Sequence, residues 1–195
     1  SFPDVMDRCI APTEQAIAAA LPGRRLCRAF TSGMILRKLE RRDGVVIDDV
    51  PAALDRLYAD GVDDVVIQPT HIMNGDEFDK LRAQAWPWRE RFEHLAVGAP
   101  LLTSMQDYRD TARALLGAFP PPAEDEALVL MGHGSGHYAN AAYTMLEYLL
   151  HDLGHRRVFL GTVEGYPTLD EVRRRLAETP GVRRHTLAPF MLVAG

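Results

Sequence analysis

The feature that most constrains the fold of this chain is a regular alternation between two kinds of segment. Short apolar runs rich in Val, Leu, Ile and Phe are followed by longer segments whose apolar residues recur at helical spacing. Nearly continuous apolar runs are typical of strands covered on both faces, and strands that alternate with helices predict a mainly parallel sheet. The predicted strands are 24–31, 63–72, 93–102, 126–132, 156–163 and 183–194. The predicted helices are 5–21, 33–41, 50–60, 76–92, 104–117, 138–153 and 168–178.

A proline-rich segment at 118–125 indicates where the chain divides. Pro120, Pro121 and Pro122 are followed by acidic residues, and such a run forms a stiff spacer because it cannot continue a helix. We therefore predict an α/β protein of two doubly wound lobes with mainly parallel sheets, the first spanning 1–118 and the second 119–195. Because the chain opens on a helix and ends on a strand, we expect both lobes to be incomplete at their outer ends.

The composition limits the kinds of partner that the protein can be expected to bind. Hydrophobic residues make up 47% of the chain and charged residues 25%, which is typical of a globular protein. The net charge of −5 gives no reason to expect nucleic acid or an anionic membrane as a partner, and a polyanionic substrate would need a local cluster of Arg. No apolar run approaches the roughly 20 residues that span a bilayer. Cys9 and Cys27 form no CxxC pair, so we expect reduced thiols and a cytoplasmic protein.

Polar residues gather where the predicted strands end. His71 lies at the end of the strand 63–72, His133 and His137 follow the strand 126–132, and Glu164 follows the strand 156–163. In open parallel sheets, ligands bind beyond the carboxyl ends of the strands. Imidazole and carboxylate together suit divalent metals such as Co²⁺, Ni²⁺, Fe²⁺ and Zn²⁺, and they also suit proton transfer near neutral pH.

The residues alone leave simpler interpretations open. A lone histidine at a strand end is usually a solvated or hydrogen-bonded loop residue, and the residues alone favour that interpretation of His133. His137 can be interpreted as the first-turn residue of a helix, and His71 as a side chain packed at the edge of a sheet. The run 132–137 resembles a phosphate-binding glycine loop but lacks the lysine of a P-loop. Arg173, Arg174 and Arg175 are interpreted as one solvated helix face.

Longer motifs carry a resemblance to a known family. The sequence resembles the anaerobic sirohydrochlorin cobaltochelatases, class II tetrapyrrole chelatases that insert Co²⁺ without ATP. The resemblance covers nearly the whole chain, and its motifs follow one another in the family's order. The motifs are Ala29-Phe-Thr-Ser32, Gln68-Pro-Thr-His-Ile-Met-Asn-Gly75, Met131-Gly-His-Gly134 with Ala139-Asn-Ala-Ala-Tyr143, Gly161-Thr-Val-Glu-Gly-Tyr-Pro167 and Pro189-Phe-Met-Leu-Val-Ala-Gly195.

The resemblance implies a two-lobed fold related to ferrochelatase, in which two histidines and a glutamate hold the metal. The first histidine corresponds to His133 and the glutamate to Glu164, which would also act as general base. The second histidine belongs to a loop after Gly195, where this sequence ends. The family's first strand and the small-residue loop that follows it are also expected to be missing.

The resemblance further implies the substrates. These are Co²⁺ and sirohydrochlorin, used in cobalamin biosynthesis, with no organic cofactor, no nucleic acid and no membrane. Side chains expected to shape the cleft and contact the ring are His71, Ser135, His137 and Asn140. Two alternatives stay open: insertion of Fe²⁺ or Ni²⁺ into the same ring, because ligand type does not separate these metals, and a tetrapyrrole or metal carrier without turnover. Whether the chain forms a homo-oligomer also stays open.

Overall fold

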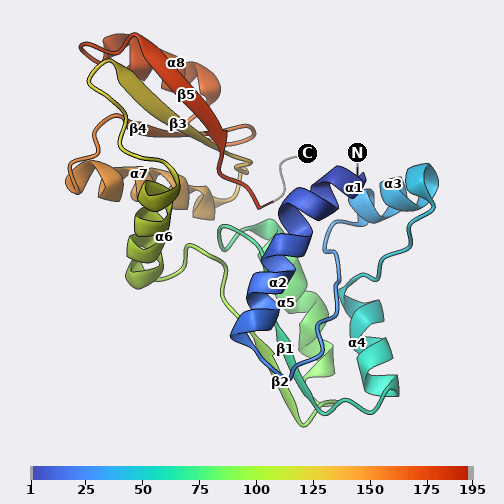
Figure 1. Cartoon of the computed structure of the whole chain (residues 1–195). Coiled ribbons are helices and arrows are strands. Elements are labelled where there is room, and N and C mark those ends of the chain that lie inside the picture. Colours follow the sequence, from blue (N-terminus) through green and yellow to red (C-terminus); the bar gives the residue numbers. More distant parts are fainter. Residues whose placement is uncertain (1, 193–195) are drawn as a thin grey trace. The chain divides into compact units, whose positions relative to one another are not determined.

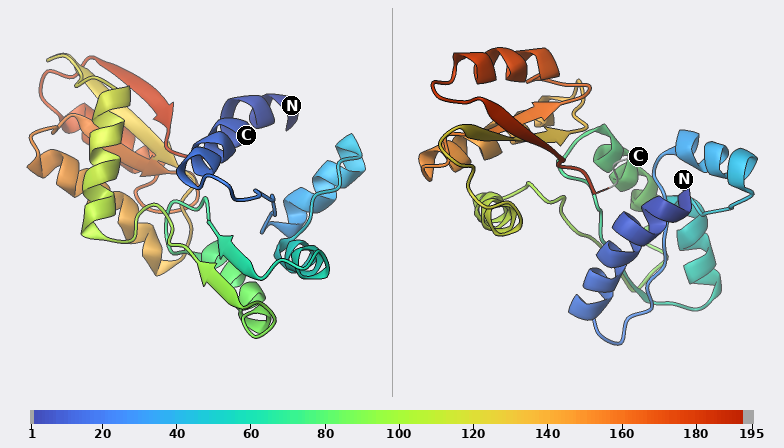
Figure 2. Two further views of the ribbon diagram at one scale, coloured as in Figure 1. Left: turned by 60° about the horizontal axis from the view of Figure 1, so that its bottom comes forward. Right: turned by 45° about the horizontal axis from the view of Figure 1, so that its top comes forward.

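The computed structural model describes residues 2–192 and the side chains of residues 4–192. The chain forms two compact units, which we describe one at a time. The first contains the chain up to residue 71, together with 76–99 and Leu192. The second contains 72–75 and 100–191 (Figure 1). Two further views of the same ribbon show the elements of each unit from other sides (Figure 2).

Helices dominate the first unit. Ser32 and Asp49 cap two of them, because the hydroxyl of Ser32 accepts a hydrogen bond from the backbone N–H of Ile35 and a carboxylate oxygen of Asp49 accepts one from Ala52. The predicted helix 5–21 contains a turn of π-helix just before Pro12, which has no N–H to donate to the helix. The elements are α1 (Phe2–Val5), η1 (Met6–Ile10), α2 (Ala11–Ala20), α3 (Gly33–Asp43), α4 (Val50–Ala59), α5 (Asp76–Ala85) and η2 (Trp86–Trp88).

The sheet of the first unit has two parallel strands, β1 (Asp64–Ile67) and β2 (His94–Val97). Its core contains side chains from α4, α5, β1 and the segment before β2: Val50, Leu54, Val65, Phe78, Leu81, Ala85 and Phe92. The strand predicted at 24–31 does not form, and only Phe30 makes a bridge, to Asp49. Its residues Arg24 and Arg25 lie at the surface in ion pairs, so this segment does not have the two covered faces that an inner strand requires.

The second unit is built on a three-stranded parallel sheet in the order β4-β3-β5. The strands are β3 (Glu126–Gly132), β4 (Val158–Thr162) and β5 (Arg184–Pro189). The helices are α6 (Met105–Ala118), the 3₁₀ turn η3 (Tyr138–Asn140), α7 (Ala141–Asp152) and α8 (Leu169–Glu178). β3 agrees with its predicted bounds, whereas β4 and β5 are shorter than predicted, and the part of the last predicted strand from 193 onward lies outside the described residues.

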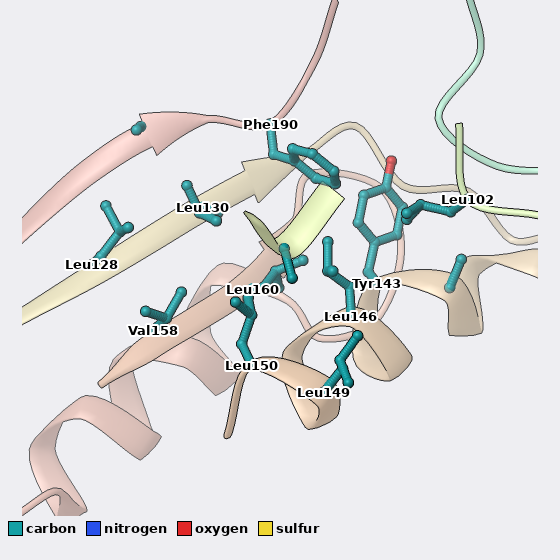
Figure 3. Packing of buried hydrophobic residues seen from close by; sticks show 13 residues of the cluster. Leu102, Leu128, Leu130, Tyr143, Leu146, Leu149, Leu150, Val158, Leu160 and Phe190 are labelled. Atoms are coloured by element: carbon teal, nitrogen blue, oxygen red, sulfur yellow. The ribbon is translucent and has the colours of Figure 1, made fainter. Parts of the chain in front are cut away.

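Helices cover both faces of this sheet. Leu128 and Leu130 of β3 belong to a cluster with residues of α6 and α7, and the intervening Val129 packs in a second cluster with Val172 of α8. Figure 3 shows Leu146, Leu149 and Leu150 of α7 near Leu130 and Leu160 of the sheet. This alternation buries β3 on both sides, which confirms the predicted α/β class with parallel strands.

The boundary between the two units does not lie at the proline run. We placed the boundary after residue 118, but α6 belongs to the second unit and the change falls near residue 100. The reason lies in the packing of α6, whose Ala112 is fully buried in the same cluster as Leu128 and Leu130. Pro120 to Pro122 are irregular, as expected, and connect α6 to β3 within one unit.

Candidate functional site

His133 and Glu164 lie side by side beyond the carboxyl ends of β3 and β4. The two strands are parallel neighbours, and their pairing continues past their ends, because the carbonyl of His133 accepts hydrogen bonds from the backbone N–H groups of Val163 at 3.1 Å and Glu164 at 2.8 Å. The Nε2 atom of His133 lies 3.5 Å from an oxygen of the Glu164 carboxylate. Both side chains are about two-thirds exposed, at 66% and 63%. A ligand can therefore reach both from solvent.

The side chain of Asn140 joins the two loops that carry this pair. It is buried, with only 8% of its surface exposed. Its Oδ1 accepts a hydrogen bond from the N–H of Ser135 at 3.1 Å in the first loop, and its Nδ2 donates to the carbonyl of Tyr166 at 2.6 Å in the second. A buried amide that satisfies both of its ends in this way fixes the spacing of the loops.

Two glycines allow the loops to lie this close. A Cβ on Gly165 would lie 2.4 Å from Oδ1 of Asn140, and a Cβ on Gly134 would lie 2.5 Å from the Cβ of Thr162. Gly134 also has a φ of +75°, a conformation that residues with a side chain rarely adopt. Thr162 is fully buried, and its N–H and hydroxyl both donate to the carbonyl of Pro167, at 2.7 and 3.1 Å.

Ser135 and His137 have local roles in the first loop. The Ser135 hydroxyl accepts a hydrogen bond from the N–H of His137 at 2.8 Å. The Nδ1 atom of His137 accepts one from the N–H of Ala139 at 3.1 Å, so His137 caps the turn η3, and its ring lies 4.1 Å from that of Tyr138. Both residues therefore help to set the shape of the loop.

Tyr143 of α7 lies beneath the end of β3. A Cβ on Gly132 would overlap its ring, so the last residue of the strand rests directly on Tyr143. Burial raises the pKa of the Tyr143 phenol above its usual range, and a backbone hydrogen bond from Gly134 acts in the opposite direction. The loop that begins at His133 therefore follows a residue that is closely packed against Tyr143.

His71 belongs to the first unit. Its ring lies 6.3 Å from the ring of Phe78, and its Nδ1 atom is buried without a hydrogen-bond partner among the described residues. Burial lowers the pKa of His71, while the nearby Glu77 acts to raise it. The ring of His71 therefore packs against Phe78 of α5.

Two of the three residues that the resemblance implies as metal ligands, His133 and Glu164, lie within the part of the chain that the structure describes. Within residues 2–192, no group of three or more His, Cys, Asp or Glu side chains is arranged to hold a metal ion. The second histidine that the resemblance implies falls after Gly195 and outside the described residues. His133 and Glu164 can offer a metal one imidazole nitrogen and one carboxylate, which is a donor set suited to a first-row divalent ion.

Sequence reasoning missed exposed apolar residues next to this pair. Val163 and Tyr166, on the loop after β4, are 64% and 60% exposed, and Tyr138, the first residue of η3, is 84% exposed. Exposed apolar side chains that cluster on a fixed scaffold are typical of binding surfaces.

The parallel sheets are those of an α/β protein, and His133 and Glu164 lie together beyond the carboxyl ends of two neighbouring strands. A search of solved structures finds the same fold in SirB from Bacillus subtilis with Fe³⁺, with a TM-score of 0.52, 14% sequence identity and coverage of 83% of this chain and 70% of that chain. The sequence profile of the cobalt chelatase (CbiK) family matches residues 1–195, and the chain belongs to this family.

Curated relatives agree with this assignment. The chain is 42% identical over 195 residues to a sirohydrochlorin cobaltochelatase of Salmonella typhimurium, and the aligned region covers 100% of this chain and 73% of the relative. It is 33% identical over 185 residues to the sirohydrochlorin cobaltochelatase CbiKC of Nitratidesulfovibrio vulgaris, which covers 93% of this chain and 64% of that relative. The predicted family and the predicted enzyme class, a metal-inserting lyase, are confirmed.

Proposed function

We propose that this protein inserts Co²⁺ into sirohydrochlorin during cobalamin biosynthesis, without ATP, and that His133 and Glu164 carry the reaction. The observation that supports this most directly is the 3.5 Å approach of the His133 imidazole to the Glu164 carboxylate on two loops locked by Asn140. The family and the names of the two curated relatives support the metal and the ring.

The chemistry of metal insertion matches this pair. The ring must lose two pyrrolic protons, and the metal must exchange water for ring nitrogens. A neutral imidazole at His133 would bind Co²⁺, and the carboxylate of Glu164 would help to hold the ion and accept a proton from the ring. Since both groups are mostly exposed, the metal and the ring can approach them together.

The remaining predicted site residues receive different roles in this proposal. Asn140 acts as a positioning residue, because both ends of its amide are occupied by backbone partners. Ser135 and His137 hold the first loop, and Tyr138, Val163 and Tyr166 offer apolar surface to the flat ring. A contact between His71 and the ring stays a prediction.

Three wider expectations belong to the same proposal. No helix between residues 2 and 192 is both long enough and apolar enough to cross a membrane. A cytoplasmic location and the absence of an organic cofactor stay predictions. Whether the chain forms a homo-oligomer stays open.

The test is an anaerobic absorbance assay of Co²⁺ insertion into sirohydrochlorin. It compares the 195-residue chain with a version extended past Gly195 by the loop that the resemblance implies, each with and without His133→Ala and Glu164→Gln. We expect insertion to depend on both residues, while binding of the metal-free ring, followed by fluorescence, changes little.

Each other outcome points to a different account. Stable binding of metal or ring with no metallated product in any version would favour a carrier. Faster insertion of Fe²⁺ or Ni²⁺ than of Co²⁺ would correct the metal. Equal loss of ring binding and insertion in His133→Ala would assign that residue to the ring instead of the metal.

A further inference from the structure

Helix α3 in the first unit carries a row of cations on one exposed face. Arg37, Lys38 and Arg41 follow Met34 at intervals of three, four and seven residues, which places them along one side of a helix. Together with Arg42 they line a shallow hollow of about 460 Å³.

The cations of this row differ in how closely they approach an acidic group, and Lys38 acts only at longer range on the carboxylate of Asp43. Arg42 forms a two-pronged pair with the carboxylate of Asp43 next to it. No ion pair joins Arg37, Lys38 or Arg41 to any carboxylate among the described residues. Several other arginines of the same unit do have acidic partners, since Arg24, Arg25 and Arg28 pair with Asp64, Asp60 and Glu14. In a chain with a net charge of −5, three neighbouring cations without ion pairs form a local excess of positive charge.

Folding does not explain the row. The helix is anchored through the opposite face, where Leu39 is buried. Cations in the last turn favour the negative end of the helix dipole, which accounts for Arg41 and Arg42 but not for Arg37 and Lys38. Met34 lies at the end of the row with 69% of its surface exposed, although an apolar side chain there contributes nothing to the core.

We propose that this row on α3 binds the carboxylates of the tetrapyrrole substrate, with Met34 contacting the ring. The three unpaired cations match a ligand with several carboxylates, and a flexible thioether suits a flat apolar edge. The protein has a net negative charge and therefore repels a polyanion. A local basic patch raises the concentration of the polyanion at the surface and the rate at which it associates. The identity of the ligand rests on the proposed function.

The experiment measures binding of uroporphyrin, a fluorescent metal-free porphyrin polycarboxylate, to the 195-residue chain. The test variant is Arg37→Gln/Lys38→Gln/Arg41→Gln, in which glutamine keeps the helix propensity similar. The charge-matched control is Arg109→Gln/Arg113→Gln/Arg156→Gln, which removes the same charge from exposed positions of the second unit. We expect about tenfold weaker binding in the test variant, since exposed charge pairs each contribute modestly, and little change in the control.

Salt and competing anions identify the kind of contact. The affinity of the unsubstituted chain should fall between about 0.05 M and about 0.5 M salt, and the test variant should lose most of that dependence. Equal affinity of the test variant and the unsubstituted chain would overturn the inference, as would an equal loss in the control or no binding at all. Binding of phosphatidylglycerol vesicles or inorganic phosphate through these cations, with uroporphyrin unaffected, would also overturn it.

The inference and the proposed function fail in different ways. Metal insertion is followed separately by absorbance with saturating sirohydrochlorin. If the chain binds uroporphyrin through α3 but inserts no metal in any version, the proposed function fails and the polycarboxylate site stands. If insertion proceeds and the test variant shows the same KM for sirohydrochlorin as the unsubstituted chain, the function stands and the site on α3 fails.

Discussion

The side-chain amide of Asn140 donates a hydrogen bond to the carbonyl of Tyr166 at 2.6 Å and so connects two loops that lie 26 residues apart in the sequence. The same side chain accepts from Ser135 at 3.1 Å. His133 lies on one of these loops and Glu164 on the other. The distance between the two proposed metal ligands therefore depends on a residue that need not touch metal or ring.

Replacing Asn140 should separate this effect from simple loss of a contact. Asn140→Ala removes both hydrogen bonds and leaves the N–H of Ser135 and the carbonyl of Tyr166 without them, which should lower the free energy of unfolding by about 1–3 kcal/mol. We also expect slower Co²⁺ insertion with nearly unchanged ring binding, because the ligand pair is misplaced. Urea unfolding and initial rates measure the two effects.

Asn140→Asp provides the graded comparison. It keeps an acceptor for Ser135 but places an oxygen opposite the carbonyl of Tyr166, so its insertion rate should also fall. An insertion rate in either variant equal to that of the unsubstituted chain would show that Asn140 does not position the pair.

The glycines of the two loops should differ sharply in their tolerance of a methyl group. Gly165→Ala places a Cβ 2.4 Å from Oδ1 of Asn140, and Gly134→Ala meets Thr162 at a φ of +75°. Each should lower the free energy of unfolding by about 1–3 kcal/mol. Gly136→Ala is the matched control in the same loop, because a Cβ there meets nothing within 4 Å. Urea unfolding of the three variants tests this order. A loss of unfolding free energy in Gly136→Ala as large as in the other two variants would contradict it.

Much of this arrangement could be predicted from the sequence, because strong local signals determine it. The strand 126–132 was predicted within its observed bounds because its apolar run is covered on both faces. The caps at Ser32 and Asp49 also follow from local chemistry. That His133 and Glu164 both follow strands was visible in the sequence. That β3 and β4 are neighbours was not, because adjacency is decided by packing.

The predictions that differ from the structure concern contacts between distant parts of the chain. Residues 24–31 have the composition of a strand but make only one bridge, at Phe30. Arg175 was interpreted as part of a solvated face with Arg173 and Arg174, yet it is three-quarters buried, at 25% exposure, beside Glu147 of α7. No local pattern reveals a partner 28 residues away.

That buried pair should be one of the costlier polar contacts to break. Glu147 has 7% of its surface exposed, and its carboxylate accepts a hydrogen bond from the N–H of Leu160 at 2.6 Å besides pairing with Arg175. Glu147→Ala leaves both partners unsatisfied and should lower the free energy of unfolding by about 3–5 kcal/mol. Glu147→Gln, which keeps an acceptor for Leu160, should lose less.

Glu178→Gln is the control for this pair. Glu178 pairs with Arg174 of the same helix at an exposed position, so its loss should change stability by less than about 1 kcal/mol. Denaturant unfolding monitored by circular dichroism ranks the three variants. A cost for Glu147→Ala no larger than for Glu178→Gln would mean that the pair contributes little net stability.

His71 should make the stability of the protein depend on pH in a defined direction. Burial lowers the pKa of His71 in the folded chain below its ordinary value of 6.5, so the unfolded chain takes up a proton more readily. The stability that neutral His71 contributes is therefore fully present above pH 6.5 and is lost as the pH falls through that value toward the folded pKa.

His71→Gln, which cannot titrate, should lose less stability than the unsubstituted chain between about pH 7.5 and about pH 5.5. Urea unfolding at the two pH values measures the difference, and parallel losses in His71→Gln and the unsubstituted chain would show that protonation of His71 does not oppose folding.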